Sequence, residues 1–392
     1  MKRRLLTMVL GLALLAGCGR APVSTPGDAG RPGQSPTTSS GASATPAHEA
    51  PRSATVTMSG DLLWHDTLWT GPAADAVRNH TGTEFDFAPL FAGMRPVFAG
   101  ADFAICHEEV PFAAPGGPYL GYPEFSAPPA IGKAIAAAGW DACTTSSNHS
   151  IDHGFAGLKR TLDTLDAAKV LHTGTFRSPA ERNTPMIYTT AAGVRIALVS
   201  GTYGTNDIPL PQGKQWSVAM LDADDMIARA KAAKDAGADI VLAAMHGGEE
   251  YDSTPNDQQV EVAKKLTASA YVDLVYGHHV HVVQPWTKIN GKWVAYGLGN
   301  LIAQHKTNLP RTYEGVTARF TFTQGSDGKY TVSKAEYIPT YISHWTPARS
   351  ARVYHVKTAL ADGEGELDRM RIALARTRAT VTRYHPAGLI ES

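Results

Sequence analysis

The chain has 392 residues with 36 basic and 36 acidic side chains, so its formal net charge is zero, and 43% of its residues are hydrophobic. This length suits one large folded domain with a small appendage. A basic block, the usual electrostatic footprint of nucleic-acid binding, is absent from the sequence, so we expect no nucleic-acid partner.

Residues 1–17 have the pattern of a bacterial lipoprotein signal peptide. Basic residues at positions 2–4 precede an apolar run at 5–15, which is too short to span a bilayer as a helix. Positions 15–18 are Leu-Ala-Gly-Cys, from which we predict cleavage before Cys18 and acylation of that residue. An ordinary secretory signal with a chance cysteine is the alternative. Several acyl chains on Cys18 would anchor the protein stably to the extracytoplasmic side of a cell membrane.

Residues 18–53 are rich in Pro, Ser, Thr, Gly and Ala and contain almost no large apolar side chains. Such a segment cannot bury enough apolar surface to offset its ordering entropy. We expect a disordered tether, whose typical reach is about 30–35 Å for roughly 35 residues of flexible coil. The folded part would therefore work close to a membrane surface.

From residue 54 onward, β-type runs alternate with helical runs. The predicted strands are 54–58, 101–106, 141–145, 194–200, 239–244 and 272–276, and the predicted helices are 87–98, 129–138, 154–168, 223–236 and 257–270. This alternation favours βαβ units and a layered α/β domain.

The pattern changes after residue 280. Asn290-Gly291 and Ser326-Asp327-Gly328 each separate two strand-like runs, and such turn residues are typical of β-hairpins. We predict an antiparallel region that completes a second sheet within a domain of residues 54–345. Residues 346–392 are predicted to form a helical extension, with its main helix at 362–379.

Two cysteines, Cys106 and Cys143, fall inside predicted core strands. Export makes a disulfide chemically possible. Because both positions have the character of buried core residues, we favour two free thiols over a bond between them.

Polar side chains gather just after the carboxyl ends of the predicted strands, which is where open α/β sheets bind ligands. The set consists of Asp61, His65, His107, Glu109, Asn148, His149, Asp152, His246, Glu249, His278, His279, His281 and Asn300. Several have an alternative structural role. Asp61 suits a turn, His65 a helix surface and Asn148 a helix cap.

The run Gly277-His278-His279-Val280-His281 is the strongest part of this pattern. Residues separated by one position project the same way from an extended chain, so we expect His279 and His281 to serve one ion or to bridge two. Imidazole, carboxylate and amide oxygen together suit Mn, Fe or Zn. The sequence holds three cysteines in all, so a structural zinc site built on thiolates is excluded.

Taken in chain order, these pieces resemble the CapA family, which is named for poly-γ-glutamate capsule synthesis. The resemblance covers about residues 54–303 and rests on the runs MSGD at 58–61, ADFAICHEEVP at 101–111, SNHSIDHG at 147–154, HGGEEY at 246–251, GHHVHVVQ at 277–284 and YGLGN at 296–300. The family is similar in fold to calcineurin-like metallophosphoesterases. The resemblance therefore implies an α/β/β/α sandwich and a divalent metal site of one or two ions.

The resemblance also implies roles for most of these residues. Metal ligands would be Asp61, Glu109, Asn148, His246, His279 and His281, and substrate or acid roles would belong to His149, Asp152, Glu249 and His278. Of these we predict His149, Asp152 and His278 as catalytic residues, and Glu249 together with His65, His107 and Asn300 as substrate contacts. The chain departs from the family's usual pattern at His107-Glu108-Glu109, where Asn-Leu-Glu is common. It also lacks the metallophosphoesterase Asp-x-His opening, because Leu62 and Leu63 follow Asp61.

Three functions agree with this pattern. The first is a metal-dependent hydrolase or transferase that acts on an anionic cell-envelope polymer, either poly-γ-glutamate or a phosphoester. The second is a non-catalytic component that binds the polymer during poly-γ-glutamate assembly or export. The third is a metal-binding or solute-binding lipoprotein.

Overall fold

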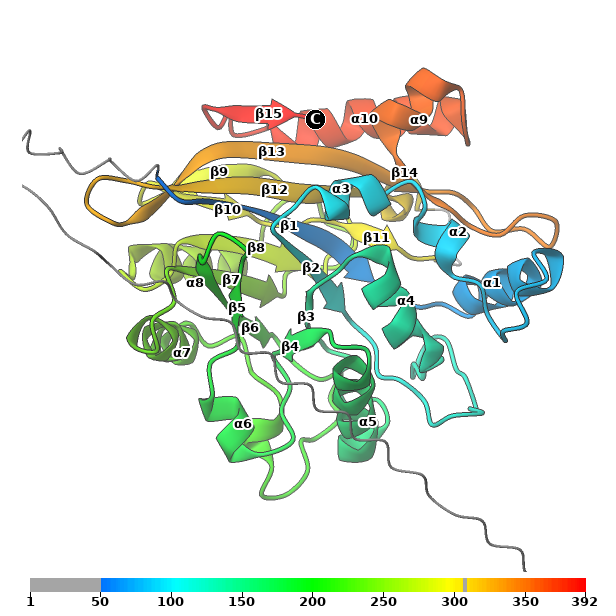
Figure 1. The fold of residues 1–392 in the computed structure, drawn as a ribbon, viewed down its shortest axis with the longest axis horizontal. Coiled ribbons are helices and arrows are strands. Elements are labelled where there is room, and N and C mark those ends of the chain that lie inside the picture. The colour runs from blue at the N-terminus through cyan, green and yellow to red at the C-terminus, as the bar shows by residue number, and fades with distance from the viewer. Residues whose placement is uncertain (1–50, 306–308) are drawn as a thin grey trace, which may run out of the picture. The chain divides into compact units, whose positions relative to one another are not determined.

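Two β-sheets lie face to face, and helices cover their outer sides (Figure 1). The computed structural model describes residues 51–305 and 309–392. The predicted signal peptide, Cys18 and the tether up to residue 50 lie outside the described residues. The part from Ala50 to Ser392 forms one compact unit.

The first sheet is mixed and has the strand order β14-β13-β12-β1-β2-β3-β4, with β11 paired to β1 and β15 paired to β13. Its strands are β1 (Ser53–Leu62), β2 (Phe103–Glu108), β3 (Ala142–Thr144), β4 (Leu171–Thr173), β11 (Asn300–Ile302), β12 (Glu314–Gln324), β13 (Tyr330–Ile342), β14 (Val353–His355) and β15 (Leu389–Glu391). The second sheet has the order β5-β6-β7-β8-β10-β9. Its strands are β5 (Ile187–Thr189), β6 (Arg195–Thr202), β7 (Ile240–His246), β8 (Leu274–His278), β9 (Trp286–Ile289) and β10 (Lys292–Ala295).

Parallel pairing decides where the polar strand ends meet. Strands β1 to β4 run parallel to one another in the first sheet, and β6, β7, β8 and β10 run parallel to one another in the second. The carboxyl ends of parallel strands lie at one edge of a sheet. Both sheets therefore bring polar residues to such an edge.

The helices are α1 (Thr67–Arg78), α2 (Ala88–Phe91), α3 (Arg95–Ala99), α4 (Ala130–Ala138), α5 (Gly154–Ala167), α6 (Pro179–Asn183), α7 (Ala223–Asp235), α8 (Asp257–Ala268), α9 (Val356–Asp362) and α10 (Leu367–Val381), with 3₁₀ turns at Gln215–Ser217 and Pro310–Tyr313. None of the helices in the described parts of the chain has the length and apolarity needed to cross a membrane.

Alternation along β2 shows how the layers are built. Phe103 and Ile105 point into the core between the two sheets, whereas Ala104 and Cys106 point into the core beneath the helices. This is the period-two pattern of a strand buried on both faces. A separate apolar cluster joins α7 and α8 to the outer face of the second sheet. The predicted α/β/β/α sandwich is confirmed.

The carboxyl-terminal residues join the first sheet as well as adding helices. Within 346–392, β14 and β15 both pair with β13. Met370 and Ala373 of α10 are buried in the core that also contains Ile338 of β13.

The helix predicted at 87–98 is wrong as a single element, because the chain forms α2 and α3 there instead. Pro96 stands in the first turn of α3, and it lacks the N–H that would bond the carbonyl of Ala92 in a continuous helix. Between the two helices, a Cβ on Gly93 would meet the carbonyl oxygen of Val353 at 2.6 Å. Close packing against β14 therefore favours a break at this point.

The prediction of two free thiols is also wrong, because Cys106 and Cys143 form a disulfide. The two residues are directly opposite each other in the parallel pairing of β2 and β3. Burial in core strands suggested inert thiols, but it is the strand register that brings these two side chains together.

We therefore expect peptide mapping after alkylation without reduction to recover Cys106 and Cys143 in one disulfide-linked pair. The bond spans 37 residues, and a loop of this size stabilises a protein by about 3–4 kcal/mol in the chain-entropy model. Cys143→Ala should lower the urea-unfolding free energy by an amount of this order. Alkylation of both cysteines in unreduced, denatured protein would contradict the assignment.

Candidate metal centre and substrate cavity

Asp61 organises the centre from the end of β1, where the pairing with β2 shifts between Met58 and Asp61. Its Oδ1 accepts a hydrogen bond from Nδ1 of His278 at 2.7 Å, and its Oδ2 accepts from Nδ1 of His281 at 3.2 Å. Burial alone would raise the pKa of Asp61, but these hydrogen bonds and the nearby imidazole charges hold it well below its usual value. Asp61 is therefore an ionised carboxylate that orients two imidazoles.

Glu109 is the one buried carboxylate among the described residues for which neither oxygen has a hydrogen-bond partner. Its side chain is 1% exposed. Its Oε1 lies 3.7 Å from Nε2 of His281 and 4.0 Å from Nε2 of His246. Burial raises the pKa of Glu109, and the charge of Asp61 adds to this effect while His281 opposes it. A buried polar group without a partner calls for an explanation, and a bound cation supplies one.

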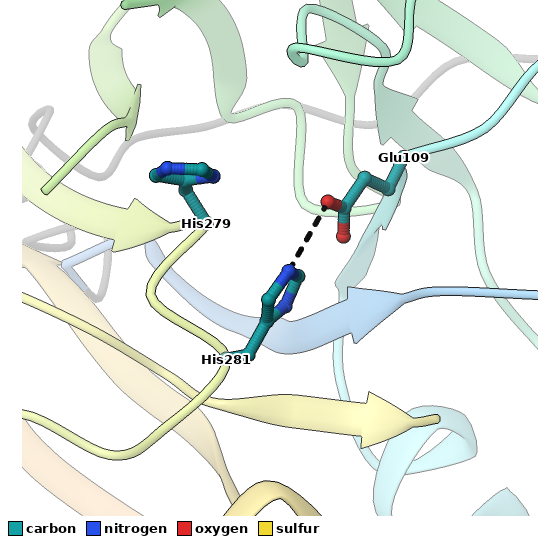
Figure 2. A group of neighbouring side chains, drawn as sticks. All are labelled: Glu109, His279 and His281. Atoms are coloured by element: carbon teal, nitrogen blue, oxygen red, sulfur yellow. Dashed lines mark ion pairs between the residues drawn. The ribbon is translucent and has the colours of Figure 1, made fainter. Parts of the chain in front are cut away.

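His279 and His281 follow β8, and the ring of His281 points at Glu109 while that of His279 lies to one side of this pair (Figure 2). The expectation that they project from an extended chain is wrong, because φ is 88° at His279 and 57° at His281. Left-handed backbone at both positions still brings their side chains to one place, with ring centroids 6.0 Å apart. Just before them, a Cβ on Gly277 would meet the carbonyl oxygen of Tyr296 at 1.9 Å, so the close approach of the chain there requires glycine.

The two imidazoles have opposite electrostatic surroundings. Burial lowers the pKa of His279 to about 3, and the charge of His281 acts in the same direction. Burial also opposes the charging of His281, but Glu109 and Asp61 outweigh it and raise that pKa to about 9. His279 keeps Nδ1 buried without a partner. It is thus a neutral imidazole with a nitrogen available to a cation.

Two sets of ligand atoms share Glu109. Glu109, His279 and His281 form one set and Asp61, His107 and Glu109 form the other, with the atoms of each set within 4.8 Å of one another. Carboxylate oxygen and imidazole nitrogen suit Mn, Fe or Zn, so the residues fit a divalent ion. His107 belongs to the second set, although the sequence suggested a substrate contact for it.

A chain of hydrogen bonds runs beside these ligands. The Thr144 hydroxyl lies 2.8 Å from Nδ1 of His107, whose Nε2 lies 2.9 Å from Nδ1 of His246. Nε2 of His246 in turn lies 2.7 Å from Oδ1 of Asn148. Burial lowers the pKa of both histidines, so they are neutral and each donates one proton along the chain. Asn148 and His246 reach the centre but are bonded to each other.

His278 and Asn300 act on neighbouring residues instead of facing the cavity. His278 is bonded to Asp61, and its ring stacks on His107 with centroids 4.2 Å apart. Asn300 presents Oδ1 at 3.0 Å from Nδ1 of His281, while its Nδ2 donates to the carbonyl of Thr312 at 2.9 Å. Since Asp61 and Asn300 both accept from Nδ1 of His281, Nε2 is the nitrogen left on the side of Glu109.

A cavity of about 580 Å³ opens beside this centre. Five residues of the predicted site line it: His65, Asn148, His149, Asp152 and His281. His65 accepts a hydrogen bond from the Gln304 backbone at 3.2 Å. Glu249 is exposed and lies outside the lining, whereas its neighbour Glu250 is part of it.

His149 and Asp152 form an oriented pair in the cavity wall. Oδ2 of Asp152 lies 2.8 Å from Nδ1 of His149 and accepts from the Phe125 backbone at 2.8 Å. A carboxylate that accepts from Nδ1 leaves Nε2 to exchange protons with a ligand. The geometry therefore suits His149 for acid or base chemistry.

Sequence reasoning missed several cavity residues that come from loops. Asn206 accepts from Nδ2 of Asn148 at 3.0 Å, which turns the amide oxygen of Asn148 toward His246. Tyr203 lies against His279 with ring centroids 4.4 Å apart. Glu250 could have been predicted as a cavity residue, because it lies next to Glu249 in the sequence. Asn206 and His305 come four and three residues after the ends of β6 and β11, so the strand-end pattern also could have indicated them.

Residues 55–305 match the family described as bacterial capsule synthesis protein PGA_cap. The chain belongs to this family. The predicted resemblance to CapA proteins is thereby confirmed, and the PGA biosynthesis protein CapA of Bacillus subtilis is 30% identical over 214 residues, which cover 52% of this chain and 51% of that protein. The capsule biosynthesis protein CapA of Bacillus anthracis is 26% identical over 266 residues, which cover 65% and 61% of the two chains.

This chain thus spans about half to three-fifths of the length of these curated relatives. Among solved structures, the calcineurin-like phosphoesterase YfkN from Bacillus subtilis is similar at a TM-score of 0.42 and 14% identity, over 85% of this chain and 99% of that chain. The putative 5'-nucleotidase from Staphylococcus aureus is similar at a TM-score of 0.45 and 17% identity, over 74% and 54% of the two chains.

Glu109→Gln should abolish the stabilisation that a divalent ion gives. The raised pKa of Glu109 means that its charge destabilises the metal-free fold at neutral pH, so the metal-free variant should be at least as stable as the wild type. With Mn²⁺ at a hundred times its Kd, the wild type should gain about 2.7 kcal/mol and the variant nothing. Thermal unfolding with and without Mn²⁺ measures both effects.

Glu108→Gln is the matched control. Glu108 is equally buried, but its Oε2 accepts from Nε1 of Trp64 at 3.1 Å, and burial raises its pKa. An amide therefore replaces a buried carboxyl group outside both sets of metal-ligand atoms. A metal-dependent rise in stability that survives in Glu109→Gln, or disappears equally in the control, would contradict the assignment of Glu109.

Metal affinity should rise with pH up to about 9. In the metal-free protein His281 carries a proton below its raised pKa of about 9, and coordination through Nε2 must displace that proton. Affinity should therefore increase by up to about tenfold per pH unit for this one proton. Calorimetric titration of Mn²⁺ at pH 6.5, 7.5 and 8.5 in buffers of different ionisation enthalpy would reveal the released proton. An affinity independent of pH would contradict this role of His281.

Proposed function

We propose that the protein is a metal-dependent hydrolase or transferase acting on an anionic cell-envelope polymer, either poly-γ-glutamate or a phosphoester. The observation that carries the proposal is Glu109, buried without a partner for either oxygen and shared by two sets of ligand atoms. A cavity with an oriented His149–Asp152 pair adjoins this centre. Membership of the capsule-synthesis family supports the choice of polymer.

The protein residues have separate tasks in this proposal. A divalent ion held by Glu109, His279 and His281, with Asp61 and His107 at a second position, would polarise the substrate and lower the pKa of a water molecule. Asp61 keeps Nε2 of His281 directed toward Glu109. The burial of these ligands excludes bulk water and strengthens every electrostatic interaction among them.

His149 would supply the proton that the leaving group needs. For a γ-glutamyl amide, the oxygen of water adds to the carbonyl carbon, the C–N bond breaks, and the amine leaves with a proton from Nε2 of His149. Asp152 stabilises the imidazolium and fixes its orientation through Nδ1. In a transferase reaction, an acceptor nucleophile takes the place of water.

We also propose that this reaction takes place at an extracytoplasmic membrane surface, with Cys18 as the lipid anchor. The basic, apolar and Leu-Ala-Gly-Cys segments at the amino terminus support this location. The long Pro- and Ser-rich segment before β1 would let the domain reach polymer above the membrane.

One observation favours the non-catalytic alternative, in which the centre only holds polymer. Both ring nitrogens of His246 are engaged, one by His107 and the other by Asn148. His107 is engaged at both nitrogens in the same way, by Thr144 and His246, so none of His107, His246 and Asn148 can bind an ion unless a bond of this chain breaks. The second metal position then has fewer ligands, and the cleft can bind polymer without turning it over.

His149→Ala should separate catalysis from binding. General acid catalysis contributes about 10²- to 10⁴-fold to rates, so release of glutamate from poly-γ-glutamate, or of alcohol from a phosphodiester, should fall by at least about 100-fold. Metal content by elemental analysis should stay unchanged, because His149 lies outside both ligand sets. His80→Ala, in an exposed loop, is the matched control.

Metal-loaded wild-type protein that binds polymer but turns over neither substrate would favour the non-catalytic alternative. Full activity in His149→Ala would remove this residue from the mechanism while leaving the metal centre intact.

A further inference from the structure

The outer wall of the cavity carries negative charge. Among the described residues that line it, Glu124, Asp152 and Glu250 are carboxylates, and none is lysine or arginine. Asp152 is committed to His149 and to the Phe125 backbone. Glu124 and Glu250 are both exposed at the mouth. Both carboxylates therefore face an incoming ligand, and Glu250 is also hydrogen-bonded to Tyr251.

Aromatic rings stand next to these carboxylates. Tyr122 is 70% exposed and Tyr251 is 38% exposed, and both line the cavity. Phe125, which is buried, lies with its ring centroid 6.4 Å from that of Tyr122. Aromatic faces beside carboxylates are a favourable environment for an ammonium group, which interacts with both.

The inner and outer parts of the site thus differ in their balance of charge when an ion is bound. A divalent ion in the inner part would be balanced by Asp61 and Glu109, which leaves the charges of Glu124 and Glu250 uncompensated. The middle of a polyanionic chain would bring its carboxylates against Glu124 and Glu250, and like charges disfavour binding. In a γ-linked glutamyl chain, only the amino-terminal residue carries an ammonium group, because every other nitrogen is part of an amide.

We propose that the cavity recognises the free amino end of a γ-linked anionic chain, with the ammonium held by Glu124, Glu250 and the neighbouring tyrosines. The first amide bond then lies toward the metal centre and His149. This inference rests on the proposed function and narrows it, since the polymer is engaged at its end and not along its length.

The test compares two ligands that differ in one charge. γ-Linked tetraglutamate with a free amino terminus and the same peptide with an acetylated amino terminus are titrated into the Mn²⁺-loaded full chain in detergent. The free peptide should bind at least tenfold more tightly at low salt, and the difference should shrink at high salt because exposed charges are screened.

Variants assign the preference to named residues. Glu124→Gln combined with Glu250→Gln should reduce the preference to less than threefold while leaving the affinity for the acetylated peptide equal or higher. Glu261→Gln, an exposed residue of α8 outside the cavity, should keep the full preference.

Each result has a definite meaning. Equal affinity for the two peptides, or tighter binding of the acetylated one, overturns amino-end recognition and leaves the metal-dependent function standing. A preference that persists in the double variant overturns the assignment to Glu124 and Glu250. Failure of both peptides to bind, with Mn²⁺ present, contradicts the polymer-directed function as well.

Discussion

The burial of two carboxylates among five imidazoles is the constraint on which the site depends. The carboxylates are Asp61 and Glu109, and the imidazoles are those of His107, His246, His278, His279 and His281, all at most 3% exposed. Asp61 is stabilised by two histidine donors. Glu109 has no such donor for either oxygen. His281 at 3.7 Å gives Glu109 an ion pair without a hydrogen bond, and a buried carboxylate with incomplete partners is destabilising, so a bound cation would stabilise Glu109 further.

The fold creates this constraint by placing the ends of parallel strands from two sheets against one another. β1 and β2 supply the carboxylate side, and β7 and β8 supply the imidazole side. The apolar core between the sheets holds them in contact. That close-packed core fixes the ends of β2 and β8, from which the short segments that carry Glu109, His279 and His281 begin.

The layered fold and the strand ends could be predicted from the sequence because apolar strands leave a clear periodic pattern. Asp61, Glu109 and His281 were identified by their place just after such strands. Position after a strand does not predict contacts that depend on strand register or on loop conformation. The disulfide between Cys106 and Cys143 depends on how β2 pairs with β3.

Other features leave no periodic signal at all. Helix α1 contains Gly71 and Pro72, residues that disfavour helix interiors in isolated sequence. Its formation reflects burial of Leu68 and Trp69 in the core. The left-handed backbone at His279 is likewise set by tertiary packing, since non-glycine residues rarely adopt it on their own.

The negative charge at the cavity mouth narrows the range of substrates that the metal centre suggests. A polymer-binding protein would be expected to present basic residues to a polyanion, whereas Glu124 and Glu250 line this mouth. A metal ion in the inner part of the site and carboxylates at its mouth give specificity, because a ligand must match this arrangement of charge along its length. Family membership supports a capsule polymer as the ligand, and the carboxylates at the cavity mouth support binding at one end of that polymer.

The most direct test of the central claim is a crystal structure of protein soaked in Mn²⁺, with anomalous scattering recorded at the manganese absorption edge. The account predicts an anomalous peak within coordination distance of a Glu109 oxygen and of Nε2 of His281. Fully ordered Glu109, His279 and His281 with no peak between them, at a Mn²⁺ concentration that saturates binding in solution, would contradict it.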